Sequence, residues 1–403
     1  MSHAQSDTRP SPFSPDSGPV PISNFRSDIQ GLRAVAVLLV VFGHAGFSGF
    51  DGGFIGVDVF FVISGFVITN LLQRQPPRQV LHNLRHFYSR RILRIVPAAT
   101  VVIVATVFAA YWIQGKFFDP TLLEDARWAT LFSANFRLIS TSTAYFIEGV
   151  DPSLLTHFWS LAVEEQFYFI YPVIVFGLTW LGRENHRTLI LRTFLIVAVS
   201  TSAIWSVIYT ATDSVAAYYS PLTRFWELAL GGLVATIPAF LTRSNPVLNN
   251  LLAIAAVVAL ALSVAFISPT SAFPGVIAWW PCGAAAVLLW TGRTTAPGGP
   301  AMWLSWKPLR FIGDVSYSFY LWHFGWLMLP KQLDFFANNS WTPIIGIIGA
   351  FICAVISYYL LENPIRHSKR LTKDGIAVAI LLLVCLALSW DATLLIEQFY
   401  LNS

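Results

Sequence analysis

An arginine and a histidine are spaced along an apolar stretch near the start of the chain. Arg33 lies at the start of the first apolar run and His44 near its end. On an α-helix their separation corresponds to a rise of roughly 16 Å, about half of a hydrocarbon core that is ~30 Å thick. If Arg33 lies at one membrane face, His44 lies near mid-membrane or beyond it. An ionisable group at that depth is a candidate for function; the alternative is a core histidine satisfied by a neighbouring helix.

A second group of basic residues precedes a later apolar run. The stretch 74–94 contains no acidic residue and carries Arg74, Arg78, His82, Arg85, His86, Arg90, Arg91 and Arg94. Such an excess of arginine is typical of a cytoplasmic segment, and fixing orientation could be its entire role. However, Arg91 and Arg94 are three positions apart and share one helix face. Planar, permanently charged guanidinium groups at a helix mouth are well suited to phosphate.

Carboxylates also occur inside apolar runs. Glu164 and Glu165 are adjacent, so they point in different directions, and at least one must face the bundle interior or a wet cavity. Arg224 and Glu227 are spaced i, i+3 and could form an intrahelical ion pair, which at a membrane interface could be purely local.

Four further polar residues complete the set that we expect to line a site. Asp58 and Ser64 lie in the second apolar run at i and i+6, which are not on one helix face, so we expect them to have separate partners. Tyr317 and His323 lie in one late apolar run. With Glu165, Arg224 and Glu227, these residues are the candidates beyond Arg33, His44, Arg91, Arg94 and Glu164.

The composition indicates which elements must position these residues. Of 403 residues, 55% are hydrophobic and 11% are charged, with a mean hydropathy of +0.62, whereas soluble domains carry about 25% charge. We therefore predict an all-α polytopic membrane protein. Cys282, Cys353 and Cys385 lie in apolar runs and are expected to pack rather than to form disulfides. No zinc-type spacing of Cys and His occurs, so we expect no metal site.

Apolar periodicity predicts eleven membrane spans, or ten if the last run is interfacial. They cover about 34–49, 54–72, 95–113, a span opening at 157–172, 188–211, a span starting at 218–232, 251–267, 274–289, 311–329, 343–361 and 375–388. We expect segment 114–156 to be extracytoplasmic, with an interfacial helix near 121–132.

Positive charge predicts the orientation and the domain limits. Arginine and lysine concentrate in the segments that lie inside when the N-terminus is cytoplasmic. Residues 1–23 are rich in Ser, Pro and Asp and are expected to form a disordered cytoplasmic tail. Residues 24–388 form the predicted membrane domain, and 389–403 a short C-terminal tail. We expect the protein in the inner, cytoplasmic membrane.

Seven motifs in this order resemble the acyltransferase-3 family of membrane-bound sugar O-acyltransferases. They are SDIQGLRAVAVLLVVFGH, GGFIGVDVFFVISGFVIT, FYSRRILRIVP, HFWSLAVEEQFYFIYP, YYSPLTRFWELALGG, GDVSYSFYLWHF and LENPIR. The resemblance covers about 24–366. The family's arginine–histidine pattern falls on Arg33 and His44, and its RxxR pattern falls on Arg91 and Arg94. Only a short segment follows Leu388, so the chain resembles the members without an added esterase-like domain.

The resemblance implies acyl transfer across the membrane. Cytoplasmic acyl-CoA, with acetyl as the default acyl group, would be the co-substrate, and no cofactor would be bound permanently. Arg33, Arg91 and Arg94 would bind its phosphates, and His44 would act as general base or as acyl carrier. Glu164, or else Glu165, would orient His44. The acceptor would be an extracytoplasmic carbohydrate or glycoside hydroxyl; the partners would include the lipid bilayer but no nucleic acid.

Two other classes of protein share these features. A transporter or flippase for an anionic, glycan-related solute would also have buried Arg, His and Glu residues and a basic inner surface. A membrane sensor without chemistry is the third possibility. Consumption of the thioester in the presence of an acceptor distinguishes the first class from the others.

Overall fold

The computed structural model describes residues 26–76, 79–141, 152–181, 186–238, 245–293, 298–333 and 339–402. These residues form helices and connecting turns, with no β-strand among them. The predicted tail 1–23 lies outside the described residues. The expectation of an all-α membrane protein is confirmed.

Each predicted span lies on a helix. These helices are α1 Ser27–His44, α2 Gly56–Gln73, α3 Val80–Gln114, α6 Phe158–Leu181, α7 Arg187–Thr212, α9 Pro221–Thr236, α11 Pro246–Phe266, α12 Trp279–Thr291, α14 Lys307–Met328, α16 Thr342–Ser357 and α19 Gly375–Asn402. Among the described residues, eight helical segments are long and apolar enough to cross a membrane. Of the other three, α9 and α12 are shorter and α14 carries polar residues such as His323.

Shorter elements connect the long helices. They are the 3₁₀ turn Asp51–Ile55, the helices α4 Thr121–Thr130, α5 Ala134–Ser140, α8 Ser214–Tyr219, α13 Pro300–Leu304, α17 Asn363–Arg366 and α18 Lys369–Lys373, the 3₁₀ turns Gly115–Phe117 and Pro330–Gln332, and the π-turn Tyr358–Glu362. The predicted interfacial helix near 121–132 corresponds to α4.

Three helices extend well beyond the spans predicted on them. Helix α1 begins at Ser27 rather than at 34, so Arg33 lies within the helix. Helix α3 begins at Val80 rather than at 95, so most of the expected basic loop is helical. Arginine is a good helix former, and hydropathy marks only the apolar part of a helix. Helix α19 continues to Asn402, through the segment expected as a tail, and packs against α3 and α4.

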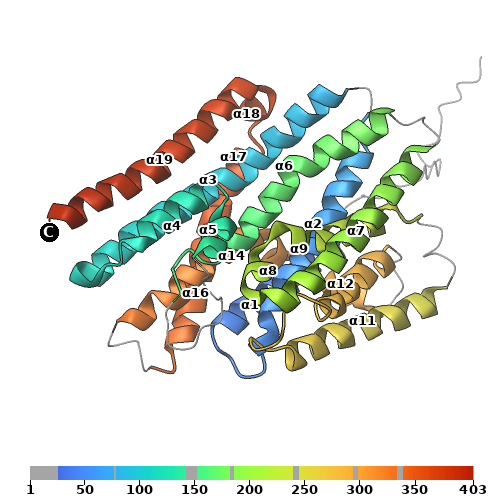
Figure 1. The fold of residues 1–403 in the computed structure, drawn as a ribbon, viewed down its shortest axis with the longest axis horizontal. Helices are drawn as coiled ribbons and strands as arrows, with labels where there is room; N and C mark the ends of the chain where they lie inside the picture. The colour runs from blue at the N-terminus through green and yellow to red at the C-terminus, as the bar shows by residue number, and fades with distance from the viewer. Residues whose placement is uncertain are drawn as a thin grey trace, which may run out of the picture.

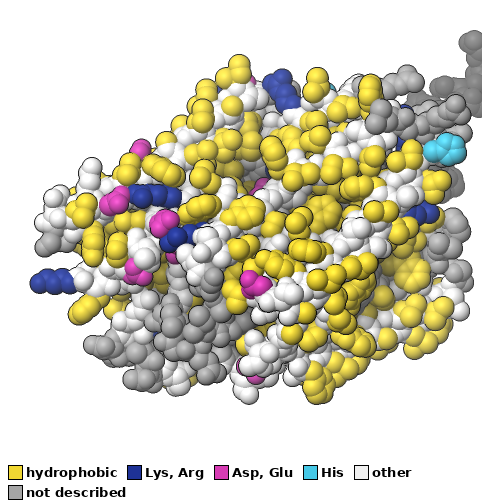
Figure 2. Space-filling view, viewed as in Figure 1, with side chains coloured by type: hydrophobic (Ala, Val, Ile, Leu, Met, Phe, Trp, Pro, Cys, Tyr) yellow, Lys and Arg dark blue, Asp and Glu magenta, His cyan; other side chains and the backbone are white. Residues whose placement is uncertain are grey.

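The long helices lie roughly side by side, with α19 and α3 at one edge and α11 at the other (Figure 1). One face of the molecule is largely apolar (Figure 2), as a lipid-facing surface requires. We call the end where α2 ends and α3 begins the arginine end. The opposite end, where α1 and α14 finish, is the histidine end.

Close helix contacts fix the two pairs of helices that carry polar clusters. A Cβ at Gly313 of α14 would lie 1.9 Å from the carbonyl oxygen of Gln30 on α1, and one at Gly65 of α2 would lie 1.7 Å from that of Leu228 on α9. Only glycine permits such an approach, as is common where membrane helices pack. These contacts bring α1 against α14 and α2 against α9.

Candidate active site

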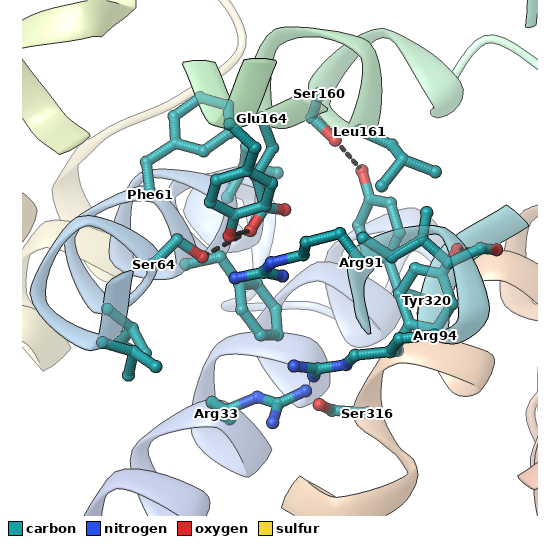
Figure 3. Close-up of a pocket in the computed structure, with 17 residues that line it drawn as sticks. Arg33, Phe61, Ser64, Arg91, Arg94, Ser160, Leu161, Glu164, Ser316 and Tyr320 are labelled. Atoms are coloured by element: carbon teal, nitrogen blue, oxygen red, sulfur yellow. Dashed lines mark hydrogen bonds between the residues drawn. The ribbon is translucent and has the colours of Figure 1, made fainter. Parts of the chain in front are cut away.

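A small cavity lies between helices α1, α2, α3, α6 and α14. Its volume is about 100 Å³, and we call it the arginine cavity (Figure 3). Its polar lining comprises Arg33, Ser64, Arg91, Arg94, Ser160, Glu164, Tyr168, Ser316, Tyr317 and Tyr320. Five helices that are far apart in sequence therefore supply one polar chamber inside an apolar bundle.

Three arginine side chains converge in this cavity, as the sequence predicted for a phosphate site. Arg33 comes from α1, and Arg91 and Arg94 come from successive turns of α3 (Figure 3). Arg33 Nη1 donates to Gln30 Oε1 at 3.2 Å. Among the described residues, none of the three guanidinium groups lies within 4.0 Å of a carboxylate oxygen. The three guanidinium groups thus face the cavity and form no ion pair with another described residue.

Glu164 lies at the opposite wall of the cavity and bonds to two hydroxyl groups. Ser64 Oγ donates to Glu164 Oε1 at 2.5 Å, and Tyr168 Oη donates to the same oxygen. The Arg91 guanidinium stacks over the Tyr168 ring, with its Cζ 3.8 Å from the ring centroid. Glu164 therefore orients Tyr168, and Tyr168 supports Arg91 by a cation–π contact.

His44 is held by a partner that the sequence reasoning did not assign to it. His44 Nδ1 lies 2.9 Å from His323 Nε2, and the two rings are nearly parallel at 19°. His323 Nδ1 lies 2.5 Å from the carbonyl oxygen of Tyr320. The structure does not bring Glu164 to His44, contrary to expectation, because the carboxylate of Glu164 is directed at Ser64 and Tyr168.

Tyr320 connects the arginine cavity with the histidines. Its side chain lines the cavity and its hydroxyl bonds to Ser160 Oγ at 2.6 Å, while its carbonyl accepts from His323 (Figure 3). A third imidazole, His157, packs 5.4 Å from His323 between ring centroids and bonds to the carbonyl of Leu321 at 3.1 Å. His323 and His157 are buried, whereas His44 is half-buried.

A larger cavity of about 800 Å³ adjoins the first at the arginine end. The two share Val67, Arg91 and Arg94 as lining residues. Its other basic lining residues are His82, Arg85, His86, Arg90, Arg366 and His367, and no acidic residue is among its lining. We call it the basic vestibule. Arg91 and Arg94 therefore lie at the boundary between the basic vestibule and the arginine cavity.

Three predicted site residues form a separate, closed cluster. Arg224 Nη1 donates to Asp58 Oδ1 at 2.7 Å and to Glu227 Oε1 at 3.0 Å, and all three side chains are at most 1% exposed. The predicted i, i+3 pair of Arg224 and Glu227 is confirmed. Asp58 and Ser64 have separate partners, also as predicted. Ligand atoms of Asp58, Glu227 and Cys282 lie within 4.8 Å of one another, but one oxygen of each carboxylate already bonds to Arg224.

Two further candidates lie beside the arginine cavity. Tyr317 lines it and donates its hydroxyl to the carbonyl of Ile95 at 2.8 Å. Glu165 is not among the residues that line the cavity, unlike Glu164, and its buried Oε1 has no hydrogen-bond partner among the described residues. Sequence reasoning missed Tyr168 and Tyr320. Tyr168 could have been found from its position one helical turn after Glu164, whereas nothing local distinguishes Tyr320.

The fold and the site define a class of protein: an all-α membrane protein with an arginine-lined chamber and a nearby histidine pair. Comparison with known proteins specifies the family. A family model described as an acyltransferase domain matches residues 26–362. The chain therefore belongs to this acyltransferase family, and the predicted resemblance is confirmed.

The curated relatives are bacterial proteins. The chain is 34% identical over 359 residues to peptidoglycan O-acetyltransferase OatA of Listeria monocytogenes, covering 84% of this chain and 56% of that protein. It is 33% identical over 353 residues to putative peptidoglycan O-acetyltransferase YrhL of Bacillus subtilis (84% and 54%), and 30% identical over 352 residues to O-acetyltransferase OatA of Staphylococcus aureus (84% and 57%). The chain spans about half the length of these relatives. No solved structure is significantly similar to it.

Proposed function

We propose that the protein is a membrane O-acyltransferase that takes an acyl group, by default acetyl, from cytoplasmic acyl-CoA. The observation that carries this proposal is that the basic vestibule and the arginine cavity share Arg91 and Arg94 as lining residues. Coenzyme A combines a phosphate-rich nucleotide with a long, thin arm. The wide, acid-free vestibule suits the nucleotide, and the narrow cavity beyond Arg91 and Arg94 suits the arm.

The three arginines, which form no ion pair among the described residues, support this assignment of the donor. Guanidinium groups bind phosphate through two parallel hydrogen bonds, which a paired arginine cannot offer. Arg33, Arg91 and Arg94 present such donors to the arginine cavity, and Arg91 and Arg94 also line the basic vestibule. Tyr168 holds the plane of Arg91 fixed by stacking, so little order is lost when a phosphate binds.

In the proposed reaction His44 acts on the acceptor hydroxyl. His44 removes the hydroxyl proton while the hydroxyl oxygen forms a bond to the acyl carbon and the carbon–sulfur bond breaks. The electron pair passes to the coenzyme A sulfur, which takes the proton from the imidazolium. On the alternative route a His44 nitrogen takes the acyl group first and then passes it to the hydroxyl. In this scheme Glu164 contributes at the donor site, through Tyr168 and Arg91, rather than as the partner of His44.

The acceptor that we propose is a peptidoglycan hydroxyl, because one of the named relatives is a peptidoglycan O-acetyltransferase and another bears that name as a putative function. In the proposed orientation the arginine end faces the cytoplasm and the histidine end faces outward. Arg33 lies in the first half of α1 and His44 is its last residue, and this separation along the helix fits a reaction in which donor and acceptor arrive from opposite sides.

Two measurements test this proposal. Purified protein with acetyl-CoA should release free coenzyme A when soluble peptidoglycan fragments are added, and the fragments should gain one acetyl group by mass spectrometry. Release of coenzyme A without acetylated fragments would reject peptidoglycan as the acceptor. No release with any glycan would favour the transporter, which transport of labelled fragments in proteoliposomes would then test.

Orientation needs its own test. A single cysteine introduced as His82→Cys should be labelled by a membrane-impermeant thiol reagent only after intact cells are opened. Labelling from outside would reverse the proposed topology and exclude a cytoplasmic donor at the basic vestibule.

A further inference from the structure

The hydrogen bonds of His323 determine where its proton lies. A carbonyl oxygen can only accept, so His323 Nδ1, 2.5 Å from the carbonyl oxygen of Tyr320, carries the proton. A neutral imidazole with a proton on Nδ1 has its lone pair on Nε2. His323 Nε2 is therefore an acceptor, and the atom that lies 2.9 Å from it is His44 Nδ1.

The position of the proton on His44 follows in the same way. Its Nδ1 must carry the proton that His323 Nε2 accepts, and in neutral imidazole the lone pair then resides on Nε2. We propose that His323 is a positioning residue that holds His44 in the Nδ1–H tautomer, so that His44 Nε2 is the nitrogen that takes the acceptor's proton or the acyl group. This inference rests on the proposed function of His44 but concerns which atom acts and what fixes it.

The surroundings of His323 make it a rigid support. Its side chain is fully buried, and both ring nitrogens are engaged, one with Tyr320 and one with His44. The close approach of α1 to α14 at Gly313 fixes the two backbones. A group that binds the second nitrogen of a functional histidine commonly fixes its tautomer and ring orientation.

This arrangement assigns His323 a defined part in the reaction. When His44 Nε2 takes the hydroxyl proton, the resulting imidazolium still donates Nδ1–H to His323 Nε2. This hydrogen bond stabilises the positive charge, and the His323 ring keeps its position. In a catalytic triad a carboxylate has this role; here the acceptor is a neutral ring. His323 exchanges no proton with substrate, so transfer to coenzyme A or to the hydroxyl runs through His44 alone.

Two amide substitutions separate the two hydrogen bonds of His323. A glutamine places its amide near the position of imidazole Nε2, so His323→Gln keeps an acceptor for His44. An asparagine places its amide near Nδ1, so His323→Asn keeps the bond to Tyr320 and loses the one to His44. We expect His323→Gln to retain most of the activity. We expect His323→Asn to lower kcat by about 10²-fold, the scale of positioned general-base catalysis, with an unchanged KM for acetyl-CoA.

His157→Gln is the matched control. His157 is equally buried and adjoins His323, but its hydrogen bond goes to the carbonyl of Leu321, which glutamine can preserve. We expect near wild-type kcat. Equal activity of His323→Asn and His323→Gln would overturn the proposal, as would equal loss in all three variants, which would indicate packing alone.

A measurement without substrate separates this inference from the proposed function. Nitrogen NMR of protein labelled with ¹⁵N-histidine, with the His44 signals assigned by their loss in His44→Gln, reports which ring nitrogen carries the proton. The expected result is a proton on Nδ1 in the wild type. A proton on Nε2 would refute the tautomer even if transfer is observed, and absence of transfer with a proton on Nδ1 would refute only the function. The wild-type spectrum decides the point even if both His323 variants fail to fold.

Discussion

Buried arginine occurs in two clusters of this protein, and the clusters differ in what neutralises the charge. Arg224 bonds to two carboxylates, and its Cζ also lies 4.9–5.4 Å from the ring centroids of three aromatic side chains. Arg33, Arg91 and Arg94 instead face a cavity, without an ion pair among the described residues. In one cluster the arginine is paired with carboxylates. In the other, the arginines form no ion pair among the described residues and line a cavity.

The difference shows that a buried charge in a membrane helix is not by itself a site. Both clusters met the criterion of intramembrane ionisable residues, and both include residues that the sequence put forward. Of these two clusters, the cavity-lining one has arginines without an ion pair among the described residues and has space for an anion. We therefore expect changes at the closed cluster to lower stability, and changes at the open cluster and at His44 to lower activity with stability largely retained.

His44→Ala should have the largest effect. It removes the proposed base, so transfer should fall by 10²–10⁴-fold, while expression and acetyl-CoA binding stay near normal because the side chain is only half-buried. Initial rates of acetyl transfer and equilibrium binding of acetyl-CoA measure the two quantities. A residual rate within about threefold of wild type, far inside the range for a general base, would make His44 a packed core histidine. His44→Gln is the control, because recovery of activity there would show a structural imidazole.

Arg224→Met should have the next largest effect, on stability. It leaves Asp58 and Glu227 as buried carboxylates without their cation, which typically costs about 3–5 kcal/mol. The apparent unfolding temperature in detergent and the yield of monodisperse protein should both fall. Adding Asp58→Asn and Glu227→Gln removes the stranded charges and should restore part of the loss.

The comparison between the clusters would fail if Arg224→Met kept its unfolding temperature and lost acetyl-CoA binding. Arg224 would then belong to the donor site rather than to a structural ion-pair cluster.

Arg91→Lys and Arg94→Lys should each weaken acetyl-CoA binding by roughly tenfold, because an ammonium point charge replaces a planar fork. Arg91→Lys should also lose the stacking on Tyr168 at 3.8 Å. Isothermal titration or a fluorescent coenzyme A analogue measures the affinity. Arg137→Lys, on α5 and bonded to Glu124 and Asp125, is the matched control and should leave affinity unchanged. Unchanged affinity in a combined Arg91→Ala, Arg94→Ala variant would limit these residues to setting orientation.

The positions of the helices could be predicted from the sequence, and so could the ion pair between residues that are close in sequence. Apolar runs located all eleven long helices because helix length and hydropathy are local properties. The pair Arg224–Glu227 followed from i, i+3 spacing. Arg91 and Arg94 were paired by their spacing, Arg33 was grouped with them by the family resemblance, and the structure brings all three to one cavity.

Contacts between distant helices could not be predicted in this way. Asp58 meets Arg224 across 166 positions and His44 meets His323 across 279. These pairings depend on which helices pack, and this is determined by close approaches such as those at Gly65 and Gly313 rather than by periodicity. Glu164 was assigned to His44 from a triad analogy, and its actual partners lie one turn away on α6 and on α2.

The smallest effect is expected at a third cluster, around Arg137, where the side chains of the ion pairs are partly exposed. Arg137 Nη2 lies 2.9 Å from Glu124 Oε2, and its Nε lies 3.3 Å from Asp125 Oδ1. Burial raises the pKa of Asp125, and the neighbouring Glu124 charge adds to this, while Arg137 and a hydrogen bond from Ser153 partly oppose it. Because the folded state holds the proton more tightly than the unfolded chain, this carboxylate lowers stability as pH rises through its folded pKa.

Asp125→Asn should therefore raise the unfolding temperature slightly at neutral pH. The corresponding gain in the free energy of unfolding should be no more than about 0.5 kcal/mol, and it should vanish as the pH falls below the pKa of Asp125 in the unfolded chain. Arg137→Gln should act in the opposite direction, because it removes the cation that offsets the burial. Unfolding temperatures of the three proteins between roughly pH 4 and pH 8 would show these opposite slopes, and a loss of stability in Asp125→Asn at neutral pH would mean that the ion pair outweighs the cost of burying the charge.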